Sequence, residues 1–191
     1  MNENIFIIIF IIILIIFYFI NYSNTRFIRS QLDNNIYQIQ DNDNYMISLK
    51  YLSLLKNNCI KLVNNLDIKN VLYEKYKKRF IRLKNKINNI PFQENDINED
   101  STSYTINKGD KIVLCLRSKK SNNHHDLNMI MYILIHELAH IICHEIGHSK
   151  LFYKINKFLL QEAIKLNIYK NINYKEYPRE YCGIELNEYL L

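Results

Sequence analysis

The sequence predicts a single small α+β domain behind an N-terminal transmembrane helix. Three observations carry this prediction: an almost unbroken apolar run at residues 5–20, helical apolar periodicity in several later segments, and two short β-rich segments around a turn between residues 104 and 116. The chain has 191 residues and is 48% hydrophobic, which suffices for one domain with a core and excludes two catalytic domains. We expect an anchor at residues 1–22, a linker at 23–44 and the domain at 45–191.

The apolar run consists of Ile, Phe and Leu and, as a helix, spans roughly 24 Å of a hydrocarbon layer that is about 30 Å thick. It is apolar on every side, whereas a core helix would be amphipathic. A cleaved signal peptide is the alternative, but no basic residue precedes the run and no small-residue cleavage site follows it. Arg26 and Arg29 lie behind the run and Glu3 before it, which predicts a single-pass protein with a cytosolic domain.

Charge and cysteine content describe the domain further. The net charge is +6, but the basic residues are scattered, so a solvated surface is favoured, while nucleic acid stays a possible partner besides the membrane. The cysteines are distant in sequence and form no C-x-x-C pair, which indicates neither a zinc ribbon nor a dense disulfide framework and fits a reducing compartment. These cysteines are Cys59, Cys115, Cys143 and Cys182.

Residues 45–90 show two helical patterns in succession, the second strongly basic and starting near Val71, and we expect them to form a hairpin that packs on the catalytic unit. Residues 94–103 form an acidic loop. Residues 104–106 and 111–116 then predict a β-hairpin around an Asn/Gly turn. If its first strand lies at the edge of a sheet, it can bind an extended peptide by strand addition.

The central motif is His136-Glu137-Leu138-Ala139-His140. It lies in an apolar helical stripe over residues 127–142, with Asp126 as a candidate N-cap. Histidines four residues apart share one helix face, so both can bind one metal ion, and the glutamate that follows the first histidine is the general base of the H-E-x-x-H arrangement. The alternative is a helix with surface histidines and no metal.

A catalytic zinc site needs a third protein ligand and one open position. Continued on the same helix, His144 would spread the three imidazoles over about 12 Å, too far for one ion with ligands near 2 Å. A turn at Gly147 brings His148 back, and an amphipathic helix over residues 151–166 follows. We therefore predict His136, His140 and His148 as ligands of Zn²⁺ and Glu137 as the catalytic base.

The motif together with Gly147-His148-Ser149-Lys150-Leu151-Phe152 resembles the WLM and SprT-like (Spartan-like) zinc metallopeptidases, over roughly residues 101–170. The resemblance implies a zincin-like fold, His148 as third zinc ligand, Phe152 as a packing residue and a strand at residues 104–116 along the active-site cleft. It implies protein substrates. The residue composition, rich in Ile, Asn, Lys and Tyr, suggests an AT-rich genome such as that of a large DNA virus.

The predicted function is that of a membrane-anchored zinc metalloendopeptidase. Two other classes remain: a zinc hydrolase such as a three-histidine nuclease, which does not need Glu137, and a membrane-tethered module that holds the metal structurally. Tyr181 and Arg179 are candidates for stabilising an oxyanion, although no pattern singles them out. His124 and His125 are expected to be exposed. The oligomeric state is not predicted.

Overall fold

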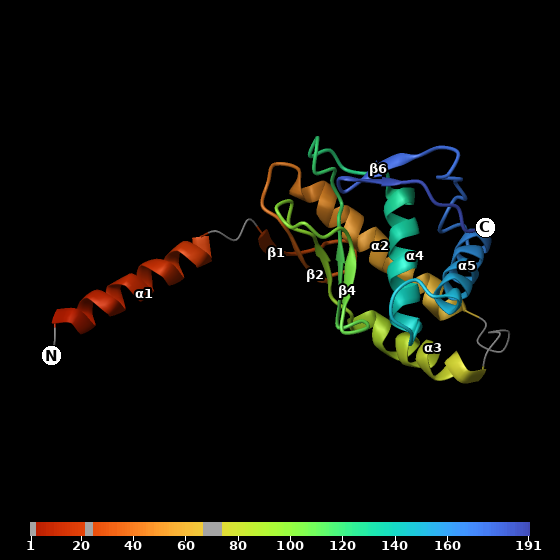
Figure 1. The fold of residues 1–191 in the computed structure, drawn as a ribbon, viewed down its shortest axis with the longest axis horizontal. Helices are drawn as coiled ribbons and strands as arrows, with labels where there is room; N and C mark the ends of the chain where they lie inside the picture. Colours follow the sequence, from red (N-terminus) through yellow and green to blue (C-terminus); the bar gives the residue numbers. More distant parts are fainter. Residues whose placement is uncertain (1–2, 22–24, 67–73) are drawn as a thin grey trace.

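A five-stranded mixed sheet and four helices form the domain in the computed structural model, which describes residues 3–21, 25–66 and 74–191 (Figure 1). The strand order is β1-β2-β3-β5-β4, and β6 and β7 form a separate two-stranded sheet. The elements are α1 (Glu3–Asn21), β1 (Thr25–Arg29), β2 (Ile36–Gln40), α2 (Tyr45–Asn65), α3 (Glu74–Lys86), η1 (Ile87–Asn89), β3 (Phe92–Glu94), β4 (Tyr104–Ile106), β5 (Lys111–Leu114), α4 (Leu127–Ile142), α5 (Lys150–Lys165), β6 (Arg179–Tyr181) and β7 (Ile184–Leu186).

The predicted hairpin at residues 104–116 is confirmed, and β4 is an edge strand of the sheet. β4 and β5 are antiparallel, with Thr105 opposite Ile112. β5 and β3 are parallel, as are β3 and β2, while β1 and β2 are antiparallel. The backbone of β4 therefore has one side that no other strand of the sheet covers.

Helix α4 is the centre of the core. It packs against α2, α3 and α5, and Figure 1 shows it between the sheet and α5. Its predicted apolar stripe is confirmed, because the side chains on that face are fully buried: Ile130, Leu134, Ile135, Leu138, Ala139 and Ile142. A helix enclosed on several sides cannot shift without opening the core, so its polar face is held in one position.

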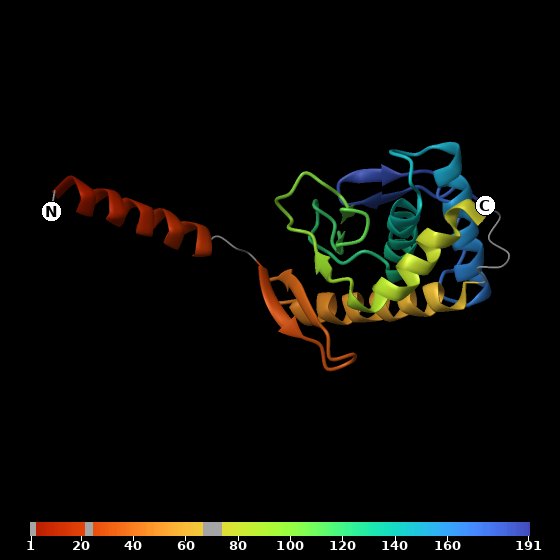
Figure 2. The same ribbon diagram turned by 90° about the horizontal axis from the view of Figure 1, so that it is seen from below.

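The β6–β7 hairpin lies near the N-terminal end of α4 (Figures 1 and 2). A disulfide between Cys115 and Cys182, with an S–S distance of 2.08 Å, joins it to the segment after β5. The spacing of the cysteines did not predict this bond, since 67 residues separate the two partners, and a disulfide does not match the expected reducing compartment. Cys143 is free and fully buried.

Two predictions about the chain's organisation need correction. The prediction of a linker at residues 23–44 is wrong, because these residues include the strands β1 and β2. Tyr37 and Ile39 of β2 are buried in the core. These two alternating apolar residues are flanked by polar residues, and so short a pattern did not predict a strand. β3 occupies the start of the predicted acidic loop. Helix α3 begins at Glu74, and Val71 lies outside the described residues.

Helix α1 covers the apolar run and stands apart from the other elements in Figures 1 and 2. Its side chains at residues 5–16 are exposed. Among the helices in the described part of the chain, none is long and apolar enough to cross a membrane. This finding does not support the predicted transmembrane anchor.

A buried ion pair connects the sheet to α2. Arg117 Nε donates to Glu94 Oε1 at 3.0 Å, and the two side chains are 1% and 0% exposed. The other Glu94 oxygen accepts from the backbone N–H of Gln40 at 3.0 Å, and the Ser48 hydroxyl donates to Oε1 at 2.9 Å. The carboxylate thus has a partner on β2, on α2 and on the segment after β5, which meets the requirement that buried charges be paired.

Removing one member of this pair should strongly destabilise the fold. We expect Arg117→Met to lower the free energy of unfolding by about 3–5 kcal/mol, because Glu94 is then buried without its counter-charge. Lys165→Met, which breaks the exposed pair with Glu162, should cost less than about 1 kcal/mol. Urea unfolding followed by circular dichroism measures both, and equal losses would contradict the role given to the buried pair.

Candidate metal centre

The histidine motif occupies the last two turns of α4. The helix begins at the predicted cap: the Asp126 side chain accepts from the backbone N–H groups of Asn128 and Met129 at 3.0 and 3.2 Å. It ends at Ile142, where the predicted apolar stripe ends, five residues before Gly147. His136 and His140 therefore project from regular helix, and the residues that follow are free to turn.

Three imidazole nitrogens converge at one point. His140 Nε2 lies 3.2 Å from Nε2 of both His136 and His148, and the remaining pair is 3.1 Å apart. Three ligands at 2.0–2.1 Å around a tetrahedral zinc ion would be about 3.3 Å from one another. The arrangement fits such an ion and leaves its fourth position open. We call these three side chains the histidine cluster.

The surroundings keep His136 and His140 neutral. Burial, and then the neighbouring His140 and His148, lower the pKa of His136 to about 3. Burial, and then His148 and Lys108, lower the pKa of His140 to about 4. The ring of Phe152 packs against all three imidazoles, with centroid distances of 4.3–4.8 Å. Neutral imidazoles whose lone pairs converge are the state that a metal ion requires.

The loop between α4 and α5 brings His148 to the cluster, and Lys108 holds this loop. Lys108 Nζ donates to the carbonyls of His140 at 3.0 Å, Cys143 at 2.8 Å and Glu145 at 3.4 Å. The ammonium group thus satisfies the His140 carbonyl in the last turn of the helix and two carbonyls of the loop, and it complements the negative end of the helix dipole. Gly147, with φ of 73°, then turns the chain.

The structure places His144 outside the cluster. Its ring stacks on Tyr76 with a centroid distance of 5.4 Å, and Nε2 lies 3.9 Å from a Glu145 carboxylate oxygen. The sequence analysis did not single out Lys108, whose position in a hairpin turn gives no sign of contact with a helix end 32 residues away.

Glu137 is buried beside the cluster, with 6% of the residue exposed. Burial raises the pKa of its carboxyl to about 8, while a hydrogen bond from the backbone of Thr105 acts in the opposite direction. A divalent cation at the cluster would lower this pKa further and favour the carboxylate. The bond from Thr105 comes from the edge strand β4, so Glu137 and the uncovered strand face each other.

Two cavities meet at Glu137. The wide cavity, of about 450 Å³, is lined by Tyr104 and Thr105 of β4 and by Lys108, His140 and Gly147. The narrow cavity, of about 240 Å³, is lined by His136, His148, Tyr132 and residues 184–188. Together they form a cleft that passes the histidine cluster. The sequence analysis missed Tyr132, although its spacing of four residues from His136 puts both on one face of α4.

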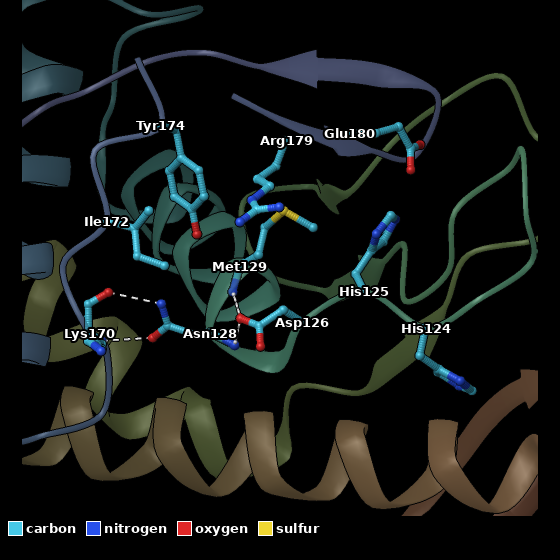
Figure 3. Close-up of a pocket in the computed structure, with 10 residues that line it drawn as sticks. All are labelled: His124, His125, Asp126, Asn128, Met129, Lys170, Ile172, Tyr174, Arg179 and Glu180. Carbon is cyan, nitrogen blue, oxygen red and sulfur yellow. Dashed lines mark hydrogen bonds between the residues drawn. The ribbon is translucent and has the colours of Figure 1, made fainter. Parts of the chain in front are cut away.

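A third cavity, of about 660 Å³, lies at the N-terminal end of α4, and Figure 3 shows Arg179, Tyr174, His124 and His125 around it. Arg179 therefore does not reach the histidine cluster. His125 is buried, and its Nε2 accepts from the backbone N–H of Cys182 at 3.1 Å; His124 is partly buried. The expectation that both histidines are exposed is wrong. The β6–β7 hairpin, which was not predicted, packs on His125. His124 packs on α2, where its Nε2 lies 3.0 Å from Ser48 Oγ.

Tyr181 lines the narrow cavity, but its hydroxyl is engaged. It lies 2.5 Å from Ser103 Oγ, and the residue is 1% exposed. The tyrosine thus joins the β6–β7 hairpin to the start of β4 and forms a wall of the cleft.

Sequence comparisons identify relatives of this chain. Residues 101–184 match the WLM domain. An uncharacterized protein of Acanthamoeba polyphaga mimivirus is 36% identical over 170 residues, which cover 88% of this chain and 86% of the relative. An uncharacterized protein of Invertebrate iridescent virus 3 is 40% identical over 49% of this chain and 57% of its own length. An uncharacterized protein of Invertebrate iridescent virus 6 is 36% identical over 56% of this chain and 60% of its own length. These viral relatives agree with the expectation of a large DNA virus.

Among solved structures, two of Wss1 from Saccharomyces cerevisiae are similar to this chain. The first is 20% identical and has a TM-score of 0.37. The match covers 48% of this chain and 75% of the Wss1 chain. The second, a mutant, is 19% identical and has a TM-score of 0.36. The match covers 60% of this chain and 86% of the Wss1 chain. The family membership rests on the sequence relatives.

The cluster geometry predicts different zinc contents for two histidine variants. His148→Ala should lose most of the zinc, because two imidazoles alone do not complete a site, whereas His144→Ala should keep it. Zinc per chain, measured by atomic absorption after dialysis against a weak chelator, tests this. Equal zinc content in the two variants, or the reverse order, would contradict the assignment of His148.

Proposed function

Because the chain belongs to the WLM domain family, we propose that it is a zinc metallopeptidase of the H-E-x-x-H type that hydrolyses peptide bonds within proteins. The observation that supports this most is the position of Glu137. It lies between the two helical histidines in sequence, beside their converging nitrogens in space, and opposite the free side of β4. A base, a metal centre and a strand that can bind an extended peptide thus share one cleft.

In this proposal His136, His140 and His148 hold the metal ion. Zinc, when bound, polarises the scissile carbonyl and brings the pKa of a water molecule near 7. Glu137 accepts the proton of this water as its oxygen attacks the carbonyl carbon. The same carboxyl group then donates the proton to the amide nitrogen as the C–N bond breaks, so that the products leave as a carboxylate and an amine.

The chain's other residues position these groups. Thr105 holds the Glu137 carboxylate through its backbone, and Lys108 holds the loop that carries His148. β4 offers its uncovered edge to a substrate backbone, as strand-adding binding sites do. Such a site takes an extended segment, so unfolded or flexible regions of proteins are the proposed substrates.

A structural metal site is less well supported. Structural zinc sites are closed by four protein ligands, frequently cysteines. Within the described ranges only the three histidines form a group of side chains that could hold a metal, and Cys143 is buried while His144 stacks on Tyr76. A three-histidine nuclease has no need for Glu137 in its buried position.

Replacing the base should separate catalysis from metal binding. We expect Glu137→Gln to keep its zinc and its fold, since the amide has nearly the shape of the carboxylate, and to lose activity by about 10³–10⁴-fold because the proton acceptor is gone. The measurement is zinc stoichiometry together with cleavage of a denatured protein, for the wild type and the variant.

Glu145→Gln is the matched control, because Glu145 lies in the following loop with an exposed side chain and takes no part in the proposed step. It should retain wild-type cleavage. Undiminished cleavage by a zinc-loaded Glu137→Gln variant would falsify the role of Glu137.

A further inference from the structure

The narrow cavity combines an apolar wall with a negatively charged mouth. Ile133, Tyr181 and Leu186 contribute apolar surface, and Glu185 and Glu188, on and after β7, are exposed. Its volume of about 240 Å³ is below the range for drug-sized ligands, so it fits one amino-acid side chain. His136 and Glu137 line the same cavity, which puts that side chain next to the reacting bond.

The charge of the cavity is opposite to that of the chain. The protein has a net charge of +6, yet none of the lysines and arginines that the structure describes lines the narrow cavity. Glu185 bonds only with the Asn187 side chain, at 3.3 Å, and neither Glu185 nor Glu188 has an ion-pair partner among the described residues. These two carboxylates therefore carry uncompensated charge.

Tyr132 adds a polar group to the cavity. The residue is only 5% exposed and lines the cavity, and its hydroxyl makes no hydrogen bond with any residue that the structure describes. The hydroxyl oxygen is not one of the fully buried polar atoms without a partner, so it is accessible from the open space of the cavity. After burial, the nearby Glu188 carboxylate is the largest cause that raises the pKa of Tyr132, so the tyrosine stays a neutral phenol. It can accept a hydrogen bond from a donor that enters.

We infer that the narrow cavity binds a lysine or arginine side chain of the substrate, at the residue next to the scissile bond. The aliphatic stem packs on the apolar wall, and the cationic head reaches Glu185, Glu188 and the Tyr132 hydroxyl, which suits side chains with an apolar body and a charged tip. In the wide cavity on the other side of Glu137, the cationic Lys108 disfavours the same side chain. This inference rests on the proposed peptidase function and specifies its substrate.

The cleavage test uses the zinc-loaded full chain and peptides that differ at one position. A peptide library digested by the wild type and sequenced by mass spectrometry should show Lys or Arg directly beside the cleaved bonds. For matched peptides with Lys or Gln at that position, kcat/KM should favour Lys by at least tenfold. Cleavage beside neutral residues without such a preference would overturn the inference and leave the peptidase function standing.

Variants of Glu185 and Glu188 test whether these two carboxylates cause the preference for Lys, measured as the ratio of kcat/KM for the Lys peptide to that for the Gln peptide. Glu185→Gln and Glu188→Gln should each reduce the Lys-to-Gln ratio by about two- to fivefold, the range of partly exposed ion pairs. The double change to lysine should reverse the ratio. Glu176→Gln is the matched control, since this exposed glutamate bonds with Asn173 and lies outside the cavity; its ratio should equal that of the wild type. A ratio that stays the same in the double variant would also overturn the inference.

A binding measurement separates this inference from the proposed chemistry. The matched Lys and Gln peptides are labelled with a fluorophore and titrated with the zinc-loaded Glu137→Gln variant. The anisotropy of the peptide should give a Kd at least several-fold lower for the Lys peptide than for the Gln peptide. This readout needs no turnover. Equal Kd values would overturn the cavity assignment even if the wild type cleaves peptides, and tighter Lys binding would support it even if no cleavage were found.

Discussion

The convergence of three imidazole nitrogens within 3.2 Å is the constraint on which the rest of the structure depends. A rigid helix can supply two of them, since residues four apart face the same way, but it cannot supply the third. The helix must therefore stop, turn, and still be fixed closely enough for ligand distances near 2 Å. Burial of α4 on several sides provides the first part of this rigidity, and the loop after it provides the second.

The loop is fixed from outside the helix. Lys108 belongs to a turn in which Asn107, Lys108 and Gly109 all have positive φ, and the unusual backbone carries its ammonium group to the end of α4. A Cβ on Gly109 would approach Ile141 Cγ2 to 3.2 Å, so the turn sits directly against the helix. The hairpin therefore does two things at once: it offers the edge strand β4 and closes the helix end that carries His140.

The elements that could be predicted from the sequence are those whose sequence signals lie within a few residues of one another. α4, α5 and the β4–β5 hairpin have periodicity, caps and a turn within a few residues, and the structure contains them. β1, β3, β6 and β7 are three to five residues long, which is too short for a periodic signal. β3 pairs with β2 and β5, which are distant in sequence, while β6 and β7 pair with each other. The residues of the cleft differ in the same way. His136, Glu137 and His140 share one motif, and Tyr132 lies on the same face of α4 as His136, whereas Lys108 and Glu188 reach the cleft only through the fold.

The two ends of α4 thus differ in charge for a structural reason. At its C-terminal end the exposed carbonyls attract a cation, and Lys108 fills that place from the wide cavity. Near its N-terminal half, the β6–β7 hairpin brings Glu185 and Glu188 to the narrow cavity, and the disulfide to Cys182 holds this hairpin to the sheet. An extended peptide along β4 would meet positive charge on one side of Glu137 and negative charge on the other. The helix that carries the histidines therefore also gives the cleft a direction.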